Sequence, residues 1–118
     1  MKKVLFGIGV LFLFSCSEDK TRHEFHYIIT GDYKEAKNLY GEMGPGIKFD
    51  AATIAIPFEV MHEVYGNNLQ YLLRIEDTDT SHHYHVKVFI DDQLIKESST
   101  YDMTNNPPRI SVSGTFVE

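Results

Sequence analysis

The stretch that decides the fold is residues 83–90, which read His83-Tyr84-His85-Val86-Lys87-Val88-Phe89-Ile90. Every second residue is apolar, which is the period of a β-strand with one buried face. The alternation separates the side chains into an inward set of Tyr84, Val86, Val88 and Ile90 and an outward set of His83, His85, Lys87 and Phe89. Asp91-Asp92-Gln93 then turns the chain into Leu94 to Ser98, so we expect a β-hairpin here.

The same alternation recurs on both sides of this hairpin. It predicts further strands at Glu24–Gly31, Leu69–Glu76 and Arg109–Val117, and shorter ones at Asn38–Gly41, Ile47–Phe49 and Thr53–Phe58. Residues 59–65 fit either a strand or a helical turn, and their β-branched residues favour a strand. Seven to eight short strands with regular turn signals predict an all-β fold, an Ig-like antiparallel β-sandwich. The chain has no tryptophan, so the Cys…Trp…Cys pattern of true immunoglobulin domains is absent.

The chain opens with Met1-Lys2-Lys3, continues with an uncharged run over residues 4–14, and reaches Leu13-Phe14-Ser15-Cys16. The apolar run is too short to span a bilayer and has the length of a signal-peptide core. Together these residues resemble the signal peptide and lipobox of bacterial lipoproteins. The resemblance implies cleavage before Cys16 and lipid attached to Cys16. The alternative is an ordinary signal peptide or membrane anchor with an incidental cysteine.

These boundaries divide the chain into three parts. Residues 1–15 are expected to be the signal peptide, residues 16–23 a lipidated cysteine with a polar tether, and residues 24–118 one sandwich domain. Ser17 follows the cysteine, and it differs from the aspartate that retains lipoproteins in the inner membrane. The resemblance therefore implies a cell-envelope protein in the outer membrane rather than the inner membrane.

The net charge is −6, and residues 1–15 contribute two lysines and no acid. An acidic surface argues against nucleic acid as a partner and favours cationic ones. Cys16 is the single cysteine, so the domain must be stable without disulfides. The sequence suggests no cofactor.

Three motifs resemble the periplasmic domain of the mycobacterial membrane protein small family: Tyr27-Ile28-Ile29-Thr30-Gly31, then Ile56-Pro57-Phe58, then the segment from Val86 to Glu97. The resemblance implies an Ig-like β-sandwich and an accessory role beside an envelope transporter. The chain departs from that family in two places. Asp92 stands where the family has a turn glycine, and a lipobox replaces the transmembrane helix.

Histidines are the strongest candidates for chemistry. His82, His83 and His85 lie close together, just after Asp77 and Asp79. On a strand, His83 and His85 point to the same face at a spacing that suits two imidazoles on one metal ion. These histidines are either an ordinary exposed polar surface or a ligand site. In the second case, the protein would be a metal- or small-ligand-binding lipoprotein that uses His82, His83 and His85.

The remaining residues favour binding over catalysis. Ser98, Ser99, Ser111 and Ser113 lack a nucleophile-elbow pattern, so we expect no enzyme. Three outward residues, Leu72, His85 and Phe89, would share one surface if the strands at 69–76 and 83–90 pair. The sequence thus predicts a non-enzymatic domain that contacts another envelope protein.

Overall fold

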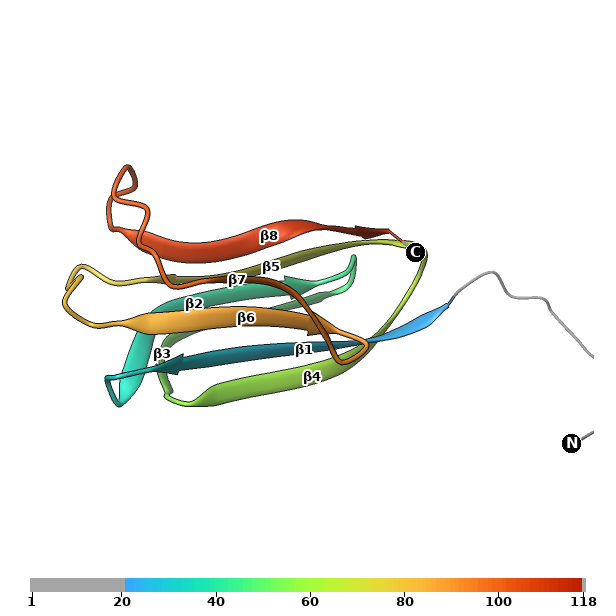
Figure 1. The fold of residues 1–118 in the computed structure, drawn as a ribbon, viewed down its shortest axis with the longest axis horizontal. Coiled ribbons are helices and arrows are strands. Elements are labelled where there is room, and N and C mark those ends of the chain that lie inside the picture. The colour runs from blue at the N-terminus through green and yellow to red at the C-terminus, as the bar shows by residue number, and fades with distance from the viewer. Residues whose placement is uncertain (1–20, 118) are drawn as a thin grey trace, which may run out of the picture.

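The computed structural model describes residues 21–117, which form eight strands in two antiparallel sheets packed face to face (Figure 1). Sheet A contains, in spatial order, β4 (Phe58–Tyr65), β1 (Arg22–Gly31), β6 (Tyr84–Ile90) and β7 (Gln93–Ser98). Sheet B contains β3 (Ile47–Ala55), β2 (Glu35–Met43), β5 (Asn68–Glu76) and β8 (Arg109–Val117). The predicted all-β sandwich is therefore confirmed.

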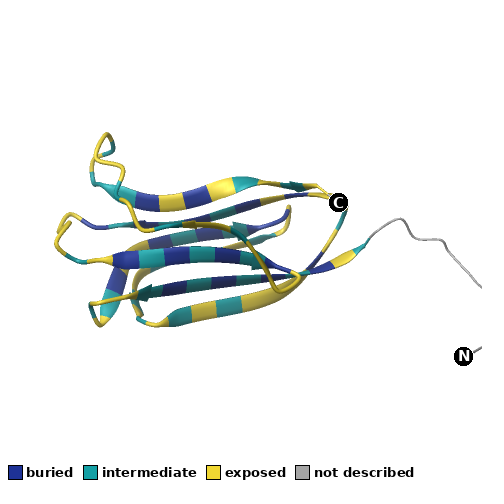
Figure 2. Ribbon diagram, viewed as in Figure 1, coloured by how far each residue is buried: buried dark blue, intermediate teal, exposed yellow. Residues whose placement is uncertain are grey.

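The core lies between the sheets and follows the predicted alternation (Figure 2). All four inward residues of β6 are buried, as are Leu69, Tyr71, Leu73 and Ile75 of β5. Beside β6 in sheet A, β1 contributes Phe25, Tyr27 and Ile29, each 0% exposed. Burial of this many large side chains is the main force that holds a domain without disulfides together.

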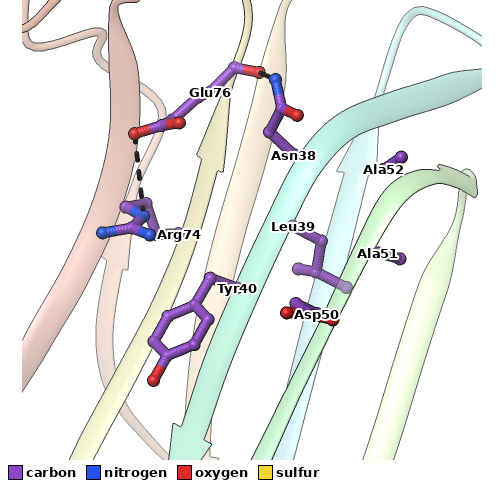
Figure 3. Close-up of a pocket in the computed structure, with 8 residues that line it drawn as sticks. All are labelled: Asn38, Leu39, Tyr40, Asp50, Ala51, Ala52, Arg74 and Glu76. Atoms are coloured by element: carbon purple, nitrogen blue, oxygen red, sulfur yellow. Dashed lines mark hydrogen bonds and ion pairs between the residues drawn. The ribbon is translucent and has the colours of Figure 1, made fainter.

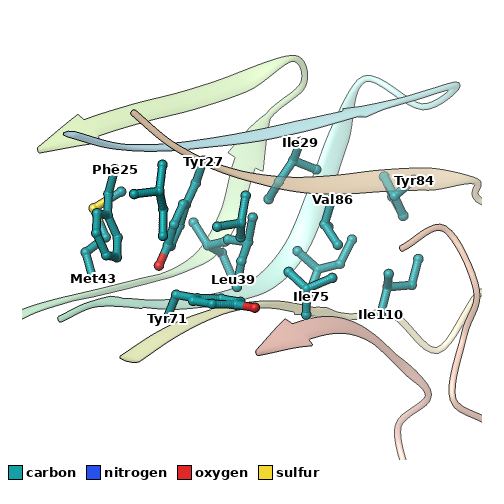
Figure 4. Packing of buried hydrophobic residues seen from close by; sticks show 14 of the residues in the cluster. Phe25, Tyr27, Ile29, Leu39, Met43, Tyr71, Ile75, Tyr84, Val86 and Ile110 are labelled. Carbon is teal, nitrogen blue, oxygen red and sulfur yellow. The ribbon is translucent and has the colours of Figure 1, made fainter. Parts of the chain in front are cut away.

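Two buried tyrosines tie the sheets to each other (Figure 4). The hydroxyl of Tyr27, from sheet A, donates a hydrogen bond to the carbonyl of Glu42 in β2. The hydroxyl of Tyr84, also from sheet A, lies 2.8 Å from the carbonyl of Glu35 at the other end of β2. Each aromatic ring thus fills the core while its polar end is satisfied. Burial is the main cause that raises the pKa of both tyrosines.

The turn between β6 and β7 matches the predicted hairpin. Asp91 and Asp92 both have positive φ, 53° and 65°, the pattern of a type I′ turn. Aspartate tolerates this region better than most residues, so Asp92 can stand where a glycine is usual.

Two strands differ from their predicted bounds. β2 extends over Glu35–Met43. Ile47–Phe49 and the first part of Thr53–Phe58 join into the single strand β3, which ends at Ala55, and Phe58 begins β4. Both differences arise because buried and exposed residues stop alternating strictly at one point within each strand. Asn38 has a φ of 54°, and the buried residues of β2 change there from Ala36 to Leu39, three positions apart.

The ambiguous segment is a strand. All eight residues of β4, from Phe58 to Tyr65, pair with consecutive residues of β1. Pro57 lies in the turn before β4, so the missing N–H does not interrupt a ladder.

The two ends of the sandwich carry different connections (Figure 1). Thr21 and the end of β8 lie at one end, here called the Thr21 end, where Gly66 N–H donates to the Thr21 carbonyl. The loops after β1, β5 and β7 gather at the opposite, distal end. β1 begins at Arg22, two residues before the predicted strand, and His23 is buried. The described residues include no helix with the length and hydropathy of a membrane span.

Candidate binding face

An apolar row crosses the outer face of sheet A. The Cα register places Met61, His26, Phe89 and Leu94 opposite one another on the four strands, and we call these residues the sheet A row. Met61 and Leu94 are 47% and 45% exposed. The rings of His26 and Phe89 lie 5.9 Å apart, which makes the middle of the row aromatic. An apolar row whose two edge residues are exposed and whose middle is aromatic marks a potential contact surface.

Carboxylates border this row on both sides. Glu59 lies beside it with its Oε1 2.7 Å from His26 Nε2, and Glu97 occupies the same side on β7. On the other side Glu63 Oε2 lies 2.6 Å from Arg22 Nη1 in an ion pair, and both side chains are more than half exposed. The outer face of sheet A is therefore an apolar strip whose margins carry three carboxylates, each paired with a neighbouring side chain, and Lys87 in the same register row as Glu59 and Glu97. We call the two carboxylate-bearing rows the acidic margins.

The structure separates the three residues predicted to share a surface. His85 and Phe89 do lie on the outer face of sheet A, because β6 alternates as predicted. Leu72 lies on β5, which belongs to sheet B, so the expectation that Leu72 shares that face is wrong. The chain crosses between the sheets in the loop after β5, and β5 and β6 never pair. The exposed Met61 and Leu94, which the sequence reasoning missed, take the place predicted for Leu72.

The three clustered histidines each face a different carboxylate. His83 Nδ1 lies 2.8 Å from Asp32, and His85 Nε2 lies 2.5 Å from Glu97. His82 Nδ1 lies 3.0 Å from Asp77. The imidazoles are thus held apart on separate partners instead of converging on one point.

Within residues 21–117 no three ligating side chains come together in a way that could hold a metal ion. His85 lies on β6 and His83 immediately precedes that strand, and their carboxylate partners come from β7 and from the loop after β1. No observation in this part of the chain favours the metal-binding alternative over the binding face.

Asp77 is the centre of a polar network at the distal end. Its Oδ1 accepts the backbone N–H of Asp79 at 2.9 Å, and its Oδ2 lies 3.0 Å from His82 and 3.2 Å from the Tyr84 hydroxyl. The His82 ring stacks on Tyr33 with centroids 3.9 Å apart. Burial raises the pKa of Asp77, but the hydrogen bonds outweigh it and the net shift is downward.

Tyr101 closes the same network from the loop before β8. Its hydroxyl donates a 2.8 Å hydrogen bond to the His82 carbonyl. Burial and the nearby carboxylates of Asp77, Asp79 and Asp32 raise the pKa of Tyr101 to about 12. The network therefore joins the loops that follow β1, β5 and β7, and its polar groups bond to one another.

A shallow depression of about 370 Å³ lies on the outer face of sheet B (Figure 3). Asp50, Arg74 and Glu76 are the charged residues that line it, and Arg74 and Glu76 contact each other. The Arg74 guanidinium lies over the Tyr40 ring at 5.1 Å and 3.9 Å from Glu76, which also receives a 2.8 Å ion pair from Arg109. The charges of Arg74 and Glu76 are thus partly compensated beside the depression.

At the Thr21 end, Asp91 holds the start of β1. One carboxylate oxygen accepts the backbone N–H of Glu24 at 3.0 Å, and the other lies 2.6 Å from His23 Nδ1. The His23 ring also packs edge-on against Phe116. Cys16, the predicted lipidation site, lies outside the described residues, but this contact fixes the point where the chain joins the domain.

The Asp91 contact predicts an acid-sensitive loss of stability. The Glu24 N–H and then His23 lower the pKa of Asp91 in the folded protein. A carboxyl group with a lowered folded pKa stabilises above its unfolded value, about 3.9, and loses that contribution as pH falls through the folded pKa. Asp91→Asn should therefore reduce the melting temperature at pH 7 and have less effect at pH 3.

Asparagine also tolerates the positive φ of Asp91, so this variant removes the charge without forcing the turn to change. Because Asp91 is about half exposed, the expected loss is below about 1 kcal/mol. Melting curves from pH 2 to 7 check this expectation. An equal effect at both pH values would show that the turn, and not the carboxylate, was altered.

A comparison with protein-family models and a comparison with curated proteins each found no match to this chain.

Proposed function

We propose that this protein is a non-enzymatic lipoprotein of the bacterial cell envelope whose sandwich domain binds another envelope protein. Lipid on Cys16 would anchor it, with the outer membrane favoured over the inner membrane by Ser17. Two or three acyl chains are enough for stable anchoring without a transmembrane helix.

The observation that carries the binding proposal is the sheet A row between its acidic margins. Met61 and Leu94 expose apolar surface at the two ends of this row, and contiguous exposed apolar surface often marks a protein contact site. A protein surface with an apolar stripe and flanking lysines or arginines would match both features of this face. An anionic membrane surface would be repelled by the same carboxylates.

The position of the chain start supports the same proposal. Thr21 lies at one end of the strands, and Cys16 precedes it by only five residues. An anchor there would hold the Thr21 end near the membrane and let both sheet faces extend away from it. The sheet A row would then be open to a neighbouring envelope protein.

Cys16→Ser tests the anchor. Without the thiol no lipid can be attached, so we expect an uncut precursor and complete loss of labelled fatty acid. Ser15→Ala is the matched control, because it keeps a small residue before Cys16 and should still be lipidated. Fatty-acid labelling and membrane fractionation measure both. Incorporation of label into Cys16→Ser would refute the anchor.

A photo-crosslinking residue tests the binding face in intact cells. Placed at Met61 or Leu94, it should link the protein to one defined envelope protein. Placed at Ser113, which is exposed on sheet B, it should not. The crosslink from Met61 should weaken at high salt, because the margins of the face are charged. Equal crosslinking from both sheets would contradict a specific face.

A further inference from the structure

The four edge strands of the sandwich differ in how well they are protected. An edge strand presents unpaired N–H and C=O groups, and proteins usually block such edges with bulges, bends or covering segments. β7 has only six residues and its pairing with β6 contains a register shift between Val88 and Phe89. The pairing of β3 with β2 is interrupted at Asn38, which has a positive φ and no partner in the ladder, and the alternation of half-buried and exposed residues in β3 shifts between Ala51 and Ile54.

β8 is covered along its free side. The Lys96 ammonium donates a 3.0 Å hydrogen bond to the Ser113 carbonyl. Near its start, Asp102 and Arg109 exchange two backbone hydrogen bonds, of 2.7 Å and 3.4 Å, in an isolated bridge. Three of the four edges therefore carry a feature that hinders the addition of another strand.

β4 carries none of these features. Its eight residues pair with β1 without a register shift, and it contains neither proline nor glycine. In the described part of the chain, β4 has β1 on one side and no strand on the other. Pro57 and Gly66 bound this straight edge at its two ends. The edge is long enough to accept an extended segment of about eight residues.

The outward side chains of β4 alternate between acid and apolar. Glu59 and Glu63 have side chains 62% and 52% exposed, and Met61 and Tyr65 are 47% and 51% exposed. A second copy paired antiparallel about Met61 would set Glu59 against Glu63 twice, and like charges opposite each other are destabilising. The same carboxylates would favour lysine or arginine on an incoming strand.

We propose that β4 is a docking edge where an extended segment of the partner joins sheet A as a fifth strand. On its outward side the segment would alternate cationic residues, opposite Glu59 and Glu63, with apolar residues, opposite Met61 and Tyr65. The apolar residue opposite Met61 would lengthen the sheet A row by one position. This inference rests on the proposed function, and it specifies which part of the domain binds and what the partner presents.

A synthetic peptide tests the edge directly. The probe is Leu-Thr-Lys-Val-Leu-Val-Lys-Thr, fluorescently labelled, titrated into the full-length protein in detergent micelles. Replacing both lysines of the peptide by glutamate should raise the dissociation constant about tenfold or more. A tenfold change corresponds to about 1.4 kcal/mol, which here is divided between two cross-strand charge pairs. Glu59→Lys with Glu63→Lys should reverse this preference. Asp50→Lys, on the edge strand β3, is the matched control and should leave the preference unchanged.

N-methylation of the peptide separates strand addition from contact with the face. An added strand uses the N–H groups of alternate residues only, so methylating one alternate set should abolish binding and methylating the other should leave it intact. Equal effects of the two sets, a charge swap without consequence, or no binding of the probe would each overturn the inference. Crosslinking from Leu94 in cells would then still report on the proposed function, because Leu94 lies on the far side of sheet A from β4.

Discussion

Val88→Asp should leave much of the protein unfolded at neutral pH. Val88 is 0% exposed, lies on the central strand β6 and has Tyr27 as its neighbour in the sheet. A carboxylate at this position would have no partner between the sheets, and burying it would cost several kcal/mol. Small domains have a total stability of only about 5–15 kcal/mol. Urea unfolding, followed by tyrosine fluorescence, measures the loss.

Lys87→Asp is the control, one residue away on the outward face. Lys87 is half-buried and lies opposite Glu97 on β7. The new carboxylate would face a like charge in water, which costs a fraction of a kcal/mol to about 1 kcal/mol. Similar losses from Val88→Asp and Lys87→Asp would contradict the assigned faces of β6.

The same alternation explains which strands could be predicted. In β5 and β6 every second residue is apolar without interruption, so the inward set follows from the sequence. In β2 the buried residues Ala36 and Leu39 are three apart, because Asn38 adopts a positive φ. A search for apolar residues at every second position does not find a strand in which that spacing changes. The strand was therefore predicted too short.

Alternation also does not tell to which sheet a strand belongs. β5 and β6 are consecutive, and consecutive strands often pair, which led to the shared surface of Leu72 and Phe89. The loop over residues 77–83 crosses the sandwich instead, and Leu72 is placed on sheet B. Sheet membership depends on loop geometry and on long-range packing, for which a single sequence carries no direct signal.

The histidine cluster shows a similar limit. The spacing of His83 and His85 suggests a shared ligand, but each histidine has a carboxylate partner from a distant segment, Asp32 for His83 and Glu97 for His85. Only the register of β1 and β7 against β6 brings those carboxylates near. Sequence spacing can suggest that two histidines share a ligand, but the pairing of the strands determines which carboxylate lies beside each histidine.

Asp77→Ala should produce the largest loss of stability among single changes in the loops. Asp77 is 3% exposed, and its carboxylate contacts the Asp79 N–H, His82 and Tyr84. Tyr84 keeps the Glu35 carbonyl as a partner and His82 Nε2 keeps Asp79, but the Asp79 N–H and His82 Nδ1 would lose theirs. Each buried polar group left unsatisfied costs about 1–3 kcal/mol. We expect a lower melting temperature and faster amide hydrogen exchange in residues 77–83.

Asp79→Ala is the matched control, since the Asp79 side chain is 54% exposed and its partners can turn to water. The pH dependence separates a lost carboxylate from general damage to the loop. The pKa of Asp77 is lowered in the folded protein, so its charge stabilises above about pH 4 and ceases to do so as pH falls through the folded pKa. The stability difference between the wild type and Asp77→Ala should therefore shrink toward pH 2. A difference that stays constant from pH 7 to pH 2 would mean that the Asp77 charge does not hold the distal loops.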